Sequence, residues 1–334
     1  MFITFGEVLQ IGINRLKEAG IADAKRDAEE IMLFLMHEDR KFLFLHYKDG
    51  TDEDHADAYF SMVDRRAAGE PLQYIVGSQE FMGLPFEVNE SVLIPRQDTE
   101  SLVELALEKA KEKKRSLSVL DMCCGSGAIA VSVAHFLPKA KVTACDISAE
   151  ALEVAERNAV KKRCGGENRN FCSQIIFFVR KRKKVIQMKE TFDMILSNPP
   201  YVPTAVIGTL QKEIREHEPL GALDGGTDGL DFYRRIVKEA AVNLEKKGVP
   251  ADGDRFGSGG GGNGASGSGT DLRRDRGASG SGRTGPDRVL QKTGSEVTAA
   301  AAEFEITSAK FSFLRENYLL FSFDGVILVK LSPE

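Results

Sequence analysis

The chain has 334 residues and a formal net charge of −5, which indicates roughly two domains and no global field that would draw in nucleic acid or an anionic membrane. No apolar run approaches the roughly 20 residues of a membrane-spanning helix, and the N-terminus lacks the layout of a signal peptide. The five cysteines form no CxxC pair, a usage typical of reduced thiols. We therefore expect a cytoplasmic protein with no membrane segment and no metal site.

Residues 1–70 carry apolar side chains at helical spacing, which predicts a small helical bundle. The first two stripes are formed by Leu9, Ile13 and Leu16, and by Ala24, Ala28, Ile31, Met32 and Leu35. Asp23 is a candidate N-cap of the second helix, and a further helix is expected over residues 53–68. Two roles stay open for this bundle: a packing domain, or a docking surface for a macromolecular substrate.

Residues 71–95 change character and form a linker between the bundle and the rest of the chain. The stretch Phe81–Phe86 predicts a β-hairpin with Gly83 near its turn. Arg96 follows directly, just before the start of a predicted helix, where a purely structural arginine is unusual. We expect Arg96 to hold a carboxylate, either that of a cofactor or one of the protein's own.

The stretch 117–130 predicts the strand, loop and helix of a nucleotide-type cofactor site. An apolar strand ends at Asp121, the small residues Cys123–Gly127 follow, and an alanine-rich helix begins. The pattern is not the dinucleotide fingerprint, because a cysteine stands at the first glycine position. A second strand ends at Asp146, about 20 residues after the loop, where a carboxylate can bind both hydroxyls of a ribose.

The stretch Asp193–Tyr201 predicts a short buried strand that runs into a rigid polar turn. Asn198 brings a side-chain acceptor, Pro199 and Pro200 fix the backbone, and Tyr201 adds a flat ring. Two acceptors and a ring suit a planar NH2 group, although a proline turn that merely closes a strand is the alternative. Because α/β folds bind ligands at successive strand ends, we expect this turn to lie beside the cofactor loop.

Together these motifs resemble the peptide-chain release factor glutamine N5-methyltransferases, over residues 1 to about 248. The resemblance is carried by VLIPRQDTE at 92–100, DMCCGSG at 121–127, NPPY at 198–201, and HEP with ALDGGTDGLDFYR from 217 to 234. It implies an α/β class I methyltransferase, with a Rossmann-like mixed sheet and helices on both faces, behind a small all-α N-terminal bundle that docks the substrate.

The resemblance also implies roles for individual residues, with S-adenosyl-L-methionine as the cofactor. The residues implied to bind the cofactor are Asp121, Cys123, Cys124, Gly125, Ser126, Gly127, Asp146 and Asn198. Those implied to hold the glutamine amide are Asn198, Pro199, Pro200 and Tyr201, with Asn198, Pro199 and Tyr201 catalytic. The implied reaction is N5-methylation of the GGQ glutamine of release factors, which modulates translation termination, by a monomer that needs neither a metal nor nucleic acid.

The sequence departs from the family pattern in several places. Cys123 replaces the first loop glycine and Gln97 replaces a proline, so we expect weaker cofactor packing but not its loss. Within the expected methyltransferase domain, 96–290, the stretches 161–190 and 250–285 are basic or rich in Gly and Ser where strands are expected. Residues 291–334 match nothing in the pattern and form an unassigned tail.

We interpret both aberrant stretches as slips of the reading frame, because a linker-like composition does not suit a buried strand. Residues 251–259, read one nucleotide later, permit an apolar strand that ends in Glu-Ile-Gly. A genuine insertion is the alternative, with the basic run 180–184 as a nucleic-acid patch.

Three rival functions remain open. The first is a ribosomal-protein glutamine methyltransferase, a related enzyme that the sequence barely separates from a release factor methyltransferase. An N6-adenine or N4-cytosine methyltransferase also acts on a planar amine, but the acidic net charge argues against nucleic acid. The third is a non-catalytic binder, in which an inactive, frame-damaged homologue follows the helical domain.

Overall fold

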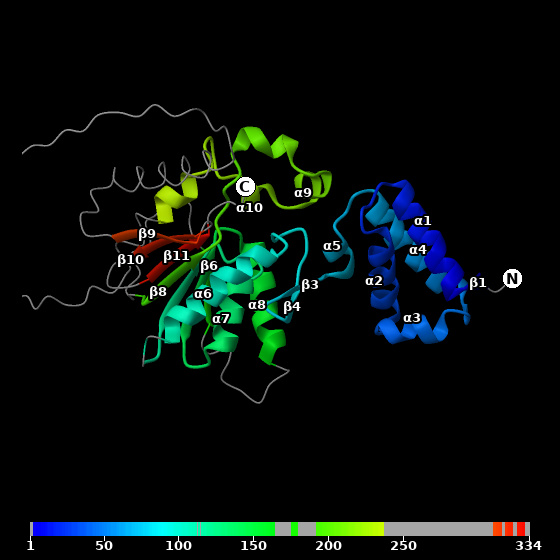
Figure 1. Ribbon diagram of the computed structural model, residues 1–334, viewed down its shortest axis with the longest axis horizontal. Coiled ribbons are helices and arrows are strands. Elements are labelled where there is room, and N and C mark those ends of the chain that lie inside the picture. Colours follow the sequence, from blue (N-terminus) through cyan, green and yellow to red (C-terminus); the bar gives the residue numbers. More distant parts are fainter. Residues whose placement is uncertain are drawn as a thin grey trace, which may run out of the picture.

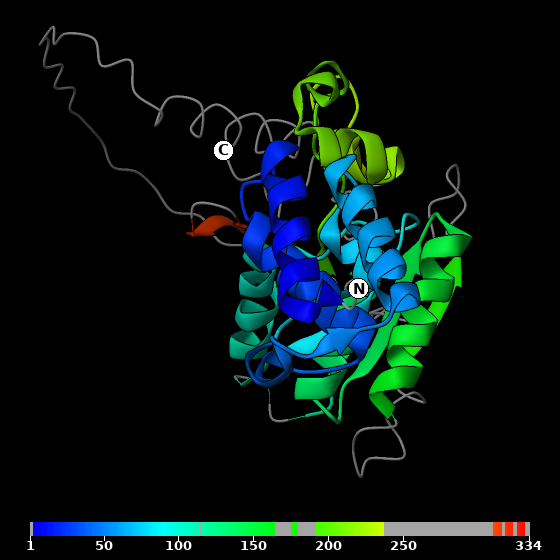
Figure 2. The same cartoon turned by 90° about the vertical axis from the view of Figure 1, so that its right-hand side faces the viewer.

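A helical bundle at the N-terminus stands beside a sheet flanked by helices (Figure 1). Figure 2 views the molecule with the bundle, in blue, in front and the sheet region, in green, behind it. The computed structural model of the chain describes residues 3–111, 113, 115–163, 175–179, 192–236, 310–315, 318–322 and 326–330. None of the helices in these ranges combines the length and apolar character needed to cross a membrane.

The bundle is built from the helices that the apolar stripes predict. Its elements are β1 (Ile3–Thr4), α1 (Phe5–Glu18), α2 (Ala24–Met36), α3 (Arg40–His46), β2 (Gly50–Thr51) and α4 (Glu53–Ala67). Thr4 and Glu7 form a capping box that starts α1. Asp23 occupies the N-cap position of α2, but its side chain accepts no capping hydrogen bond from the described residues. The core of the bundle gathers around the fully buried Ile31 and Tyr59.

The linker contains the predicted hairpin. After α5 (Leu72–Val76), β3 (Ser78–Phe81) pairs antiparallel with β4 (Leu84–Glu87). Met82 and Gly83 form the turn with φ of 54° and 71°, the left-handed pair that a tight hairpin needs. Phe81 and Phe86 meet edge to face with ring centroids 6.0 Å apart, and the Met82 N–H donates to Glu100 at 2.6 Å. The hairpin is thereby attached to Glu100, at the start of the region that contains the large sheet.

The second region is a seven-stranded mixed sheet with the strand order β7-β6-β5-β8-β11-β10-β9. Its strands are β5 (Ser118–Met122), β6 (Lys141–Asp146), β7 (Ile175–Val179), β8 (Met194–Ser197), β9 (Lys310–Arg315), β10 (Tyr318–Ser322) and β11 (Val326–Lys330). The pairs from β7 to β11 are parallel, and β10 is antiparallel to both neighbours. A mixed α/β sheet of this kind is what the sequence predicts.

Three helices pack on this sheet and on one another in series (Figure 1). They are α6 (Glu100–Lys111), α7 (Ala128–Phe136) and α8 (Ala149–Arg163). α6 contacts α7, and α7 contacts α8, so the three share one face. The expectation of helices on the second face concerns parts of the chain outside the described residues.

Strands occur in two stretches that the sequence analysis set apart. β7 lies within 161–190, and β9, β10 and β11 lie within 291–334, so part of the unassigned tail belongs to the sheet. β11 pairs in parallel with β8, the position next to the central strand. The rest of 161–190 and all of 250–285 lie outside the described residues, and the frame-slip interpretation stays a hypothesis.

A buried arginine, Arg66, joins the bundle to the segment that follows β8. Arg66 of α4 donates to Asp27 of α2 at 2.7 Å and to Glu213 of α9 (Lys212–His217) at 2.8 Å. The Lys212 ammonium adds a bond to the carbonyl of Ala68 at 2.9 Å. Since the Arg66 and Asp27 side chains are both about nine-tenths buried, the Arg66–Asp27 pair is shielded from solvent.

Replacing Arg66 with methionine keeps the volume but leaves the Asp27 carboxylate buried without its cation. We expect the free energy of unfolding to fall by about 3 kcal/mol, as for other broken buried pairs, in urea denaturation followed by circular dichroism. The control is Arg40→Met, which breaks a largely exposed pair with Glu30 and should cost less than about 1 kcal/mol. Equal losses for the two variants would contradict a stabilising role of the buried contact.

Candidate active site

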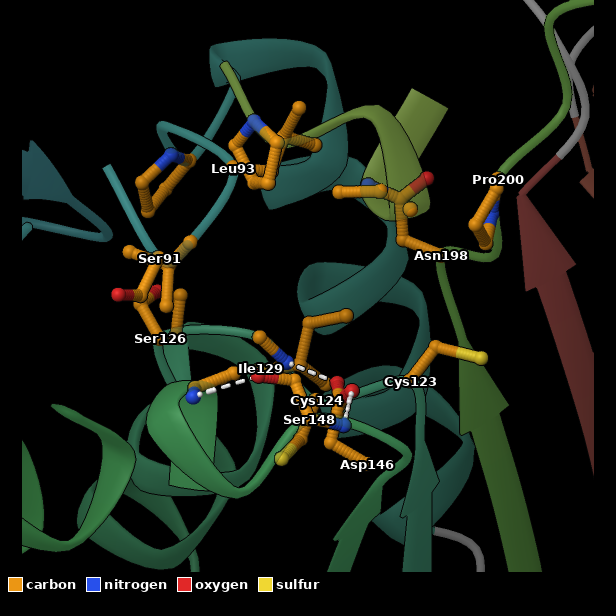
Figure 3. Close-up of a pocket in the computed structure, with 18 of the residues that line it drawn as sticks. Ser91, Leu93, Cys123, Cys124, Ser126, Ile129, Asp146, Ser148, Asn198 and Pro200 are labelled. Carbon is orange, nitrogen blue, oxygen red and sulfur yellow. Dashed lines mark hydrogen bonds between the residues drawn. The ribbon is translucent and has the colours of Figure 1, made fainter. Parts of the chain in front are cut away.

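A pocket of about 340 Å³ lies at the carboxyl edge of the sheet, where β5, β6 and β8 end (Figure 3). This volume falls in the range of about 300–1,000 Å³ that is usual for small-molecule sites. Its walls come from the segment before α6, the loop after β5, the end of β6, the turn after β8, and residues 219–232. Asn198 and Pro200 lie on one side, and Ser91 and Ser126 lie on the other.

The loop after β5 is a tight turn held by backbone hydrogen bonds. The Cys124 N–H donates to the Cys145 carbonyl at 3.1 Å, and the Gly127 N–H donates to the Cys124 carbonyl at 2.8 Å. Gly127 has a φ of 78°, and a Cβ there would come within 3.0 Å of the Ala155 Cβ. Glycine at this position therefore allows both the turn and the close packing of α7 against α8.

Cys123 lines the pocket with a φ of 62°, in the left-handed region that favours glycine. The replacement of the loop glycine thus introduces backbone strain, a consequence that the sequence alone did not predict. Its neighbour Cys124 is buried, and burial, with the nearby carboxylates Asp121 and Asp146, raises the pKa of its thiol. Cys124 is consequently a neutral thiol at physiological pH.

Asp121 lies beneath the pocket and does not line it. One carboxylate oxygen accepts from the Ala130 N–H at 3.0 Å, in the first turn of α7, and the other has no hydrogen-bond partner among the described residues. Complete burial raises the pKa of Asp121 well above its usual value, against the Ala130 bond and with help from the charge of Asp146. In the structure Asp121 therefore contacts α7, the helix that follows the loop.

Asp146 reaches the pocket from the end of β6 and is held by backbone donors. Its Oδ2 accepts from the Gly125 N–H at 2.9 Å, and its Oδ1 accepts from the N–H groups of Ile147 and Ser148 at 2.7 and 3.1 Å. These bonds fix the carboxylate against the loop after β5, as Figure 3 shows for two of its partners. A fixed carboxylate at this strand end suits the hydroxyls of a ribose.

Asn198 brings an unsatisfied acceptor to the pocket. Its Nδ2 donates to the Thr99 hydroxyl at 3.4 Å, whereas its Oδ1 is buried and has no hydrogen-bond partner in the part of the chain that the structure describes. The position is rigid, because the neighbouring Ser197 hydroxyl donates to the Met122 carbonyl at 2.7 Å. A buried acceptor without a partner suggests that a ligand completes it.

Not all predicted residues line the pocket. Those that do are Cys123, Cys124, Gly125, Ser126, Asp146, Asn198 and Pro200, and those that do not are Asp121, Gly127, Pro199 and Tyr201. Burial raises the pKa of the Tyr201 phenol, with a contribution from the Asp98 carboxylate. Its backbone packs tightly on the segment beyond it, since a Cβ at Gly229 would lie 2.4 Å from the Tyr201 carbonyl oxygen.

The sequence analysis missed part of the wall. Pro219, Gly221, Ala222 and Phe232 line the pocket, but the sequence analysis gave none of them a role of its own. Arg96 forms an ion pair with the buried Glu218, which also accepts from the Ile94 N–H at 3.3 Å. The expectation that Arg96 holds a carboxylate is confirmed, and the carboxylate is the protein's own. The HEP motif was the signal that this segment belongs to the site.

We assign the α/β region to the class I methyltransferases, because its small-residue loop, its strand-end carboxylate and its amide-bearing turn meet at one edge of a largely parallel sheet. Residues 7–77 match the PrmC N-terminal domain, and residues 98–215 match the methyltransferase small domain.

Named relatives narrow the class. The chain is 42% identical over 245 residues to the release factor glutamine methyltransferase of Geobacter sulfurreducens, covering 73% of this chain and 82% of that protein. It is 39% identical over 249 residues to the protein of the same name from Moorella thermoacetica, covering 75% and 84%. The chain therefore belongs to the release factor glutamine methyltransferase family. Among solved structures, a methyltransferase from Pyrococcus furiosus aligns with 72% of this chain and 84% of its own at 15% identity, with a TM-score of 0.39.

Replacing Cys123 with glycine should relieve the strain of its positive φ. We expect an increase of about 1 kcal/mol in the free energy of unfolding, measured by urea denaturation. The matched control is Cys124→Gly, which removes a buried side chain from a residue outside the positive-φ set and should destabilise. The strain interpretation would be wrong if both glycine variants lost stability.

Proposed function

We propose that this protein transfers a methyl group from S-adenosyl-L-methionine to the side-chain nitrogen of the GGQ glutamine in peptide-chain release factors. One observation supports the proposal above the others: Asn198 lines the pocket next to the loop after β5, and its buried Oδ1 has no hydrogen-bond partner among the described residues. The names of the relatives support the same substrate.

The residues around the pocket fit the proposed cofactor. The backbone of Cys123–Ser126 allows close approach at one end, and Asp146 offers a fixed carboxylate to ribose hydroxyls. S-adenosyl-L-methionine, when bound, supplies an electrophilic methyl group on a positively charged sulfur. The apolar lining residues Leu93, Ile129 and Pro219 help to exclude water from this space.

Methylation of a glutamine amide depends chiefly on how the amide nitrogen is positioned and oriented. An amide nitrogen is a weak nucleophile, because its lone pair is delocalised into the carbonyl. The Asn198 Oδ1 would accept one N–H of the glutamine amide, and the backbone carbonyl of Pro199 is proposed for the other. These acceptors raise electron density on the nitrogen as positive charge develops, and fixed orientation contributes several kcal/mol, as a general magnitude.

Tyr201 is proposed to pack on the substrate amide, and the structure offers indirect support. Its phenol is neutral and largely buried, and its main chain is fixed by the bridge between Val202 and Asp224. The ring is thus attached to a rigid segment beside Asn198. It does not line the pocket itself, so its contact would be with the glutamine and not with the cofactor.

The helical bundle is proposed to dock the release factor. All residues of α3 are at least partly exposed, and Phe44 and Leu45 keep 87% and 70% of their surface in solvent. Exposed apolar side chains of this size are typical of interaction surfaces. Because release factors act on ribosomes, we infer a cytoplasmic enzyme, and we propose that it works as a monomer.

The direct test is to incubate the purified chain with S-adenosyl-L-methionine and a release factor, and to locate the added methyl group by tandem mass spectrometry. We expect one methyl group on the GGQ glutamine and none when that glutamine is replaced by asparagine. Methylation of a ribosomal protein or of a DNA oligonucleotide instead would favour a rival substrate. Binding of the cofactor without transfer to any of them would indicate an inactive homologue.

Asn198→Ala removes the proposed acceptor and should lower kcat by about 100-fold, the loss typical of one preorganised hydrogen bond to a reacting group. Asn198→Asp keeps an oxygen acceptor at this position and should retain more activity. The measurement is the initial rate of methyl transfer at saturating cofactor. Asn14→Ala, an exposed position on α1, is the control and should leave the rate unchanged. Equal rates for Asn198→Ala and wild type would contradict the assignment.

A further inference from the structure

Asn158 is a fully buried amide on α8 that the proposed chemistry does not use. It does not line the pocket, and no motif described above contains it. Its Nδ2 nevertheless reaches the cofactor loop, where it donates to the Ser126 carbonyl at 2.9 Å. A polar side chain with no solvent exposure must satisfy its hydrogen-bonding groups within the protein.

The same amide pairs with the end of the hairpin. The Glu87 N–H donates to the Asn158 Oδ1 at 2.7 Å, and the Asn158 Nδ2 donates to the Glu87 carbonyl at 2.9 Å. The oxygen meets only a donor and the nitrogen meets only carbonyls, so the network determines which way the amide points. Asn158 thus joins β4 to the cofactor loop through one rigid group.

Both ends of this bridge reach the pocket wall. Ser126 lines the pocket. It lies between Gly125 and Gly127, which have φ of 52° and 78°. At the other end, the hairpin contributes Phe81 to the same wall. A shift of the Asn158 amide would therefore be felt on two walls of one pocket.

We propose that Asn158 is a positioning residue that fixes the position of the cofactor loop relative to the hairpin. The loop conformation is permissive, because its glycines tolerate several backbone states, and the bond to the Ser126 carbonyl selects one of them. The inference rests on the proposed function only in taking S-adenosyl-L-methionine as the ligand of the pocket.

The chain offers a matched control on the same helix. Arg157 donates to the Glu87 carboxylate at 2.7 Å and Lys161 pairs with it as well, but neither bond reaches the cofactor loop. Arg157→Ala therefore weakens the attachment of α8 to the hairpin and leaves the Asn158 bridge in place. A purely structural role for the α8–hairpin contact would make the two positions behave alike.

The experiment is calorimetric titration of wild type, Asn158→Asp, Asn158→Ser and Arg157→Ala with S-adenosyl-L-methionine, well below the melting temperature of each. Asn158→Asp places an oxygen against two carbonyls, whereas Asn158→Ser is a milder change that keeps a hydroxyl. We expect Kd to rise about tenfold or more for both Asn158 variants, because the loss of one buried hydrogen bond weakens binding by about tenfold. Arg157→Ala should stay within about twofold, because its pair is partly exposed.

A steady-state comparison completes the test. KM for the cofactor should rise in Asn158→Ser, with kcat at saturating cofactor close to wild type, because the glutamine contacts are untouched. If Asn158→Ser lowers the melting temperature but binds the cofactor as Arg157→Ala does, the residue is merely structural and the inference is overturned. If wild type itself binds no S-adenosyl-L-methionine, the proposed function fails together with the inference.

Discussion

The buried strand β8 pairs in parallel with β5 on one side and with β11 on the other, with Ile195 opposite Leu120 and Ile327. Both of its ends are fixed. Asp193 accepts from Arg115 and from the Ser118 N–H, each at 2.9 Å, and Ser197 donates to the Met122 carbonyl. Because a slip of one residue would turn every side chain to the opposite face, this register decides where the Asn198 amide points.

The site around that strand end is assembled from segments that have no fold of their own. The Arg96–Glu218 pair closes the segment before α6 onto the segment after α9, and the Glu218 carboxylate is almost fully buried. Burial raises the pKa of Glu218 although the Arg96 charge opposes the effect. Since a buried carboxylate is costly without its cation, loss of Arg96 would destabilise the contact between the two segments. Arg66 also connects the helical bundle to α9 through its ion pair with Glu213, whose side chain is partly exposed.

The sequence sufficed for features whose determinants are local. The bundle stripes, the turn at Gly83, the cofactor loop, and the polar residues at the ends of β6 and β8 all follow from spacing over a few residues. The position of Cys123 was identified as a departure, but its φ required the structure. The sequence gave no sign that Phe232 lines a pocket.

Contacts between distant residues were beyond such reasoning. Arg96 and Glu218 are 122 residues apart, and Asn158 and Glu87 are 71 apart, so no local pattern links them. Arg96 invited the expectation of some carboxylate, because an arginine before a helix is conspicuous. Asn158, a single asparagine within α8, does not stand out in the sequence. Its role follows only from its burial and its hydrogen bonds. The strands β9, β10 and β11 were missed because the stretch that holds them matched no motif.

The position of β11 has a consequence for the order in which the protein can mature. During synthesis β8 leaves the ribosome long before β11, its partner in the finished sheet. Until then one side of the central strand exposes unpaired N–H and C=O groups, the condition that invites pairing with foreign chains. Closing this gap spans a long stretch of sequence, which makes the step slow. One edge of the central strand therefore stays unpaired until β11 has been synthesised.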